Sequence, residues 1–185
     1  MSLLRWLGVT PDGPDSDKTL DDETDTMRRI ATELETLPEE RARYLAAFAY
    51  ILGRVAYADA SVSPRETTKM QEIVQTLGHL PQAQAVLVVE IAKSQVRLLG
   101  GTEDFLVSRR FREMATRQQR LELLECVFAV TAADDSVTVV EEGQARQISK
   151  ELRLSHDDFI AARSGYHEHL EALKSLRRKQ AAPRD

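Results

Sequence analysis

The sequence has almost no cysteine and few aromatic, glycine or proline residues, and each shortage excludes a class of protein. Its 185 residues include one cysteine, Cys126, so neither an intramolecular disulfide nor a zinc site built on several cysteines can form. With 5% aromatic residues, 8 glycines and 6 prolines, the chain is not collagen-like or low-complexity. No apolar run reaches the roughly 18 residues that a transmembrane helix needs. The N-terminal MSLLRWLG is too short for a signal peptide and is interrupted by Arg5, so we expect a cytoplasmic protein.

Charge is unevenly distributed along the chain, whose net charge is −5. Residues 12–25 carry seven acidic side chains against one lysine, and residues 174–185 carry five basic side chains against one acid. The stretch between them is mildly acidic, so no basic surface for nucleic acid is expected. The basic end suits a solvated helix terminus, and the alternative is contact with an acidic partner.

This charge pattern predicts one domain with two tails. Residues 1–25 contain Pro, Gly, Ser and acids with little apolar content after the first turn, and we expect an N-terminal tail and linker without a folded core. The domain spans 26–173, and 174–185 form a basic C-terminal tail. The role of one small apolar cluster is open between docking on the domain, a partner and a membrane surface: Leu3, Leu4, Trp6 and Leu7.

Helical periodicity runs through nearly the whole domain. Apolar residues recur at spacings of three and four from Met27 onward, and no window alternates with a period of two. Gly78 is expected to end one helix in the left-handed conformation, and Ser155 with Asp158 to cap a long last helix. We therefore predict an all-α domain of seven or eight antiparallel helices.

A repeat at an offset of 75 residues organises these helices. ADASVSPRE at 58–66 matches ADDSVTVVE at 133–141, and apolar seams continue in register on both sides. A helix–loop–helix unit that occurs twice predicts two pseudo-symmetric halves, each covering the apolar face of the other.

Each loop of the repeat carries a capping signal. Ser63 and Thr138 are good N-cap residues, and Glu66 and Glu141 follow three positions later, which is the spacing of a capping box. The simplest interpretation of these glutamates is that they cap their helices and do nothing else.

Each loop also carries an aspartate that helix propensity does not explain. Asp59 and Asp134 lie near helix C-termini, where the dipole disfavours a carboxylate by roughly 0.3–1 kcal/mol. A loop N–H, a basic partner or a cation must stabilise them. If the loops meet, four oxygen ligands suited to Ca²⁺ or Mg²⁺ converge: Asp59, Glu66, Asp134 and Glu141.

At these residues the sequence resembles the tellurite-resistance TerB-like family, whose signature at each junction is close to A-D-G-x-[VIL]-[ST/D]-x-x-E. The resemblance covers roughly residues 26–170 and is densest over 132–163. It implies two related helical halves, a divalent-metal site built from those paired acids, and a role in tellurite or stress response. Where the family usually has glycine, this chain has Ala60 and Asp135, and Asp135 is a possible additional ligand.

No motif in the sequence supports an enzyme. There is no phosphate loop and no Ser-His-Asp or Cys-His arrangement, and Cys126 lies on an apolar seam. Two functions are favoured: a divalent-cation-binding protein, or a metal-free protein–protein interaction module such as a co-chaperone-like adaptor. A third and weaker alternative is a metal-dependent hydrolase, whose centre would be the carboxylate cluster with a metal-bound water.

Overall fold

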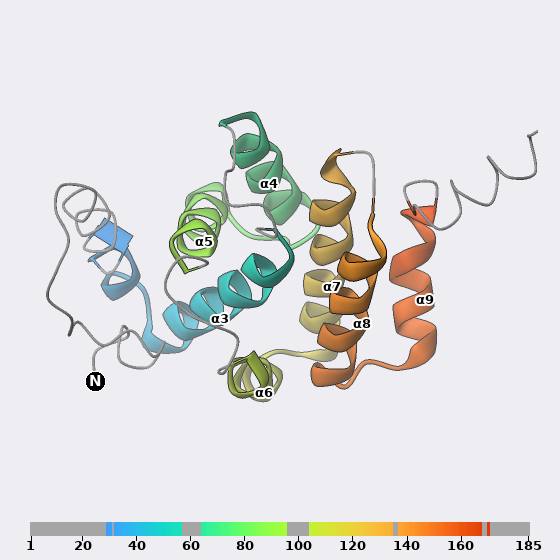
Figure 1. Cartoon of the computed structure of the whole chain (residues 1–185). Helices are drawn as coiled ribbons and strands as arrows, with labels where there is room; N and C mark the ends of the chain where they lie inside the picture. The colour runs from blue at the N-terminus through green and yellow to red at the C-terminus, as the bar shows by residue number, and fades with distance from the viewer. Residues whose placement is uncertain are drawn as a thin grey trace, which may run out of the picture.

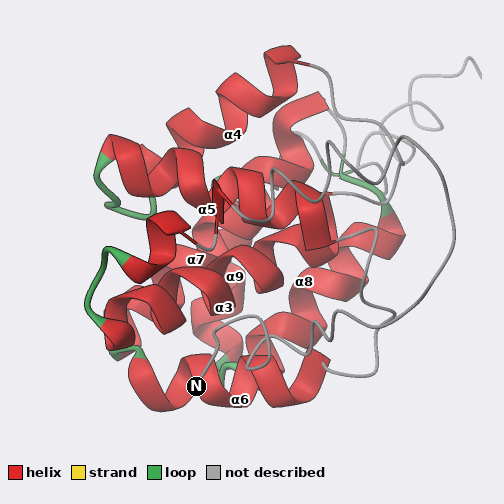
Figure 2. Cartoon of the chain, turned by 90° about the vertical axis from the view of Figure 1, so that its left-hand side faces the viewer, coloured by secondary structure: helices red, strands yellow, loops and turns green. Residues whose placement is uncertain are grey.

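The chain is seen here in a computed structural model, and its described part is helical (Figure 2). The only β feature within the described residues is an isolated parallel bridge between Val137 and Leu170. The predicted all-α class is therefore confirmed. None of the helices in this part of the chain is long and apolar enough to cross a membrane. The described residues are 29–30, 32–56, 64–95, 104–134, 137–167 and 170.

Seven α-helices and one short 3₁₀ helix have bounds within the described ranges, in agreement with the predicted number. They are α3 (Glu39–Ala56), α4 (Pro64–Thr76), α5 (Gln82–Gln95), α6 (Asp104–Met114), α7 (Arg117–Thr131), the 3₁₀ helix η1 (Ala132–Asp134), α8 (Val139–Glu151) and α9 (His156–Ser164). Residues 29–30 and 32–35 are also helical. The predicted tails, 1–25 and 174–185, lie outside the described residues.

Helix α3 is the centre of the domain. It packs against α5, α6, α7 and α8, and Figure 1 shows α4 and α5 on one side of it and α6 on the other. A helix that is surrounded in this way must be apolar on most of its faces. Its predicted seam is accordingly buried, with at most 3% of any residue exposed: Leu45, Phe48, Leu52 and Val55.

Helix α7 is the second core helix. It contacts α3, α4, α8 and α9, and α7, α8 and α9 stand side by side in Figure 1. The Phe128 ring lies 5.5 Å from the Phe159 ring and 6.1 Å from the Tyr166 ring, which fixes α9 against α7. Cys126 is fully buried on this helix, as its place on the apolar seam predicted.

The ends of two helices differ from the prediction. The left-handed residue after α4 is His79, with a φ of 50°, and not Gly78. Gly78 is instead required by packing, because a Cβ atom there would lie 2.6 Å from the Val74 carbonyl oxygen. Helix α9 is capped by Ser155 as predicted, but it is short, with 9 residues, and Gly165 is its C-cap.

Candidate functional site

The second junction of the predicted repeat begins at η1 and leads into α8. The Thr138 hydroxyl accepts a hydrogen bond from the Glu141 N–H at 3.2 Å, and Glu141 Oε2 accepts one from the Thr138 N–H at 2.8 Å. The predicted capping box is thus confirmed at this junction. It holds the Glu141 carboxylate at the positive end of the α8 dipole.

The structure describes only some of the other predicted ligands. Glu66 lies in the first turn of α4 with an exposed side chain. Asp59 and Asp135 fall outside the described residues, and Asp134 is described only through its backbone in η1. Among the described residues, no three His, Cys, Asp or Glu side chains are grouped so as to hold a metal ion. The four-carboxylate site therefore stays a prediction.

A lysine that the sequence interpretation did not single out contacts this junction. The Lys69 ammonium on α4 donates a hydrogen bond to the Ala133 carbonyl in η1. An ammonium group at that position complements the negative C-terminal end of α7. Lys69 is thus a basic partner beside the loop that carries Asp134.

An open pocket of about 420 Å³ lies next to this contact, between α4 and α7. Its walls are mainly apolar, and Lys69 and Glu72 add the charged groups. Below we call it the α4–α7 groove. Its lining residues are Lys69, Glu72, Ile73, Thr76, Leu77, Ala129, Ala132, Ala133 and Tyr166.

The first turn of α8 exposes two adjacent valines. Val139 and Val140 are 71% and 73% exposed, more than any other large apolar residue in the described part of the chain. Single exposed apolar residues are ordinary, but a neighbouring pair at the predicted functional junction is consistent with a contact surface.

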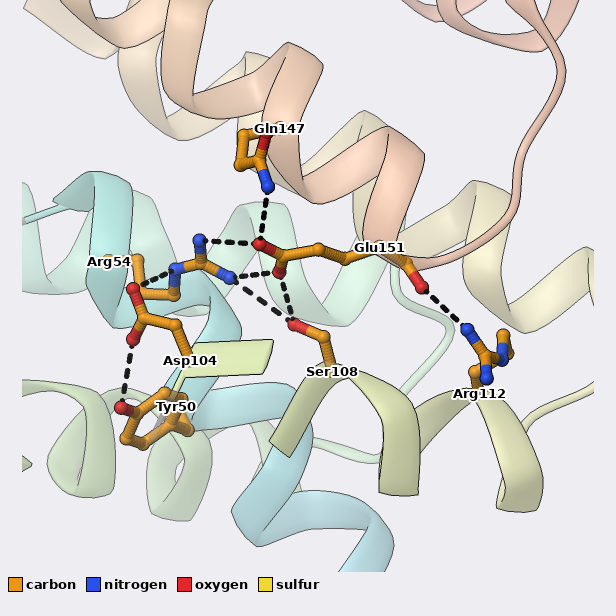
Figure 3. A network of polar contacts seen from close by, with 7 residues as sticks. All are labelled: Tyr50, Arg54, Asp104, Ser108, Arg112, Gln147 and Glu151. Carbon is orange, nitrogen blue, oxygen red and sulfur yellow. Dashed lines mark hydrogen bonds and ion pairs between the residues drawn. The ribbon is translucent and has the colours of Figure 1, made fainter. Parts of the chain in front are cut away.

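A buried polar network joins α3, α6 and α8 (Figure 3). At its centre, Arg54 Nη1 lies 2.6 Å from Glu151 Oε2, and the side chains are 9% and 6% exposed. The same guanidinium lies 3.1 Å from Asp104 through Nε. The Ser108 hydroxyl donates to Glu151 at 2.7 Å, and the Gln147 amide donates to Glu151 at 3.0 Å.

This network is structural. Two hydrogen bonds at its edges extend it, from the Tyr50 hydroxyl to Asp104 at 2.9 Å and from Arg112 to the Glu151 carbonyl at 3.1 Å. None of its members lines the α4–α7 groove. Burial alone would raise the pKa of Glu151, but hydrogen bonds from Arg54, Ser108 and Gln147 lower it overall. Glu151 is thus held ionised as a link between helices.

Comparison with known proteins places the chain in a family. Residues 44–164 match the family model described as "Tellurite resistance protein TerB". No curated protein and no solved structure matches the chain. The match begins within α3, ends at the last residue of α9 and includes both predicted junctions. The chain belongs to the TerB family.

Proposed function

We propose that this chain binds a divalent cation, Ca²⁺ or Mg²⁺, at its helix junctions and acts without catalysis in the response to tellurite or related stress. The observation that carries the proposal is the Thr138–Glu141 capping box. It fixes the Glu141 carboxylate in the first turn of α8, six positions after Asp135 and seven after Asp134 in the chain. The family name supplies the link to tellurite.

The bounds of the helices support a repeat of the junction. Helices α3 and α7 end at Ala56 and Thr131, 75 positions apart. Helices α4 and α8 begin at the same offset and have 13 residues each. Glu66 and Glu141 are therefore both the third residue of their helices, which supports equivalent roles for the two glutamates.

The chemistry of the donor set favours hard cations. Carboxylate oxygens without cysteine or histidine suit Ca²⁺ or Mg²⁺, and water molecules would complete the shell. Asp135 offers a further carboxylate to the second junction. Lys69 acts in the opposite direction, because an ammonium close to Ala133 repels a cation bound there. We therefore expect a modest affinity for the cation. Removing the Lys69 charge should raise that affinity.

Calorimetric titration of the chelator-stripped full chain with Ca²⁺, Mg²⁺ and Mn²⁺ tests the proposal. The key variant combines Asp134→Asn with Glu141→Gln. A glutamine at this helix position can keep the capping box, since Gln119 does so at the start of α7. Loss of binding in this variant would therefore reflect lost carboxylate charge rather than a lost cap.

The proposal expects saturable binding in the wild type and at least a tenfold weaker interaction, about 1.4 kcal/mol, in the double variant. The matched control is Glu113→Gln, which removes an exposed acid on α6 and should leave binding unchanged. No saturable binding of any of the three cations, or undiminished binding by the double variant, contradicts the proposal.

The exposed valines favour a second candidate, a metal-free adaptor. Val139 and Val140 would bury against a protein partner, and Lys69 would compensate the acidic loop without a cation. Val139→Ser with Val140→Ser should then abolish retention of a partner from host extract in the presence of chelator. Retention equal to that of the wild type would reject this candidate.

A further inference from the structure

We infer that residues 171–185 fold back onto the α4–α7 groove of the same chain, with Leu173 and Leu176 against its apolar wall. This inference concerns the groove and the C-terminal segment, and it does not depend on whether the junctions bind a cation.

The described part of the chain ends beside the groove. Leu170 is 1% exposed and packs with Ala132, Val137 and Tyr166 in a small apolar cluster. Ala132 and Tyr166 also line the groove. The C-terminal segment therefore starts at the edge of the groove, held there by the Val137–Leu170 bridge.

Apolar residues continue at a regular spacing beyond that anchor. Leu173 and Leu176 follow Leu170 at spacings of three, and the residues around them are mostly polar or basic. An extended chain advances about 3.3 Å per residue, so Leu173 can reach roughly 10 Å from Leu170. The apolar wall of the groove includes Ile73, Leu77 and Ala129, and the side chains of Ile73 and Leu77 are only partly buried.

The charges of the groove and of the C-terminal segment are complementary. Glu72 lines the groove, and Glu125 lies on α7 one helical turn before Ala129, which also lines the groove. Lys69, the basic residue of the lining, already donates to Ala133. The C-terminal segment brings the opposite sign, with five basic side chains against two acids: Lys174, Arg177, Arg178, Lys179 and Arg184 against Glu171 and Asp185.

These observations select the chain's own segment over a separate partner. A tethered segment has a high effective concentration at a groove beside its anchor, and a free peptide of the same sequence does not. Occupation by residues 171–185 would cover the apolar wall and place basic side chains near Glu72 and Glu125.

Paramagnetic relaxation in the full-length chain tests this inference. A nitroxide is attached to Arg178→Cys. The native Cys126 does not compete, because its side chain is fully buried and burial raises the pKa of its thiol far above the usual value. The amide signals of Ile73, Leu77 and Ala129 should lose most of their intensity and recover when the nitroxide is reduced.

Two matched variants complete the experiment. Leu173→Asp with Leu176→Asp, carrying the same label, should restore the groove signals while the domain stays folded. A label at Gln118→Cys, exposed near the other end of α7, should leave the signals of Ala132 and Ala133 unchanged.

Full intensity of the groove signals with the Arg178 label would overturn the inference. So would signal loss that is confined to another surface, such as the exposed face of α6. A further sample tests docking between two copies. It mixes chains that carry the nitroxide but no ¹⁵N with chains that carry ¹⁵N but no nitroxide. Loss of the groove signals in that mixture would identify a second copy as the occupant and would also reject docking within one chain.

Discussion

Loss of the Arg54 side chain should destabilise the domain strongly. It lies between Glu151 and Asp104 with 9% of its side chain exposed. Removing one partner of a buried ion pair leaves an uncompensated charge and typically costs about 3–5 kcal/mol. We expect Arg54→Met to lower the free energy of unfolding in urea by that amount.

Two controls accompany Arg54→Met. Arg54→Met with Glu151→Met removes both charges and should recover much of the lost stability. Arg109→Met breaks an ion pair with Glu113 in which both side chains are 57% exposed, and it should cost only about 0–1 kcal/mol. A cost for Arg54→Met as small as that of Arg109→Met would contradict a structural role for the network.

The lowered pKa of Glu151 predicts a loss of stability in acid. A carboxyl group whose pKa is lower in the folded than in the unfolded state stabilises the fold above its unfolded value, about 4.3 for Glu. This contribution is lost as the pH falls through the folded pKa. Unfolding free energies of wild type and Glu151→Gln should therefore converge as the pH falls below the unfolded pKa and through the lower folded pKa. A difference that is independent of pH would show that the charge of Glu151 does not stabilise the fold.

Gly78 and Gly143 give a matched pair of glycines. A Cβ at Gly78 meets the Val74 carbonyl oxygen at 2.6 Å, whereas at Gly143 it meets nothing within 4 Å. We expect Gly78→Ala to destabilise the domain by about 1–3 kcal/mol. Gly143→Ala, inside α8, should stabilise it by about 0.5–1 kcal/mol. Thermal unfolding of both variants checks the sign, and equal shifts would contradict this account.

At the scale of the helix, the capping boxes at helix starts were predictable, and the left-handed residues that follow helix ends were not. A start is encoded locally: Thr138 with Glu141 and Ser155 with Asp158 both form the boxes that their spacing predicts. After the end of α8, however, Arg153 has a φ of 52°, a left-handed conformation that is usually adopted by glycine. Packing against neighbouring residues determines such an end, and no local sequence pattern predicts it.

The Thr138 cap is testable at this scale. Thr138→Ala removes the hydroxyl that accepts from the Glu141 N–H and should cost about 1 kcal/mol. Glu141→Gln, which can keep the reciprocal bond, should cost less. Chemical unfolding of both variants measures the difference. If Glu141→Gln is the more damaging of the two, the carboxylate has a structural role beyond the cap.

At the scale of the whole molecule, the site was only partly predictable because its contacts join distant residues. Lys69 and Ala133 are 64 positions apart, and Arg54 and Glu151 are 97 apart. Composition and periodicity determine which faces are buried, so the all-α class and the apolar seams followed from the sequence. Which charged side chain meets which backbone carbonyl depends on how α3, α4, α7 and α8 pack, and no local pattern specifies that.

The central claim is that the two junctions of this TerB domain bring carboxylates together around a divalent cation. Crystals of the full chain grown with Mn²⁺, with anomalous diffraction recorded, test it most directly, because manganese binds oxygen ligands and is located independently of the protein atoms. The account predicts an anomalous peak at a junction, bound by oxygens from the set Asp59, Glu66, Asp134 and Glu141. Junctions without a peak, with these carboxylates directed apart, would contradict it.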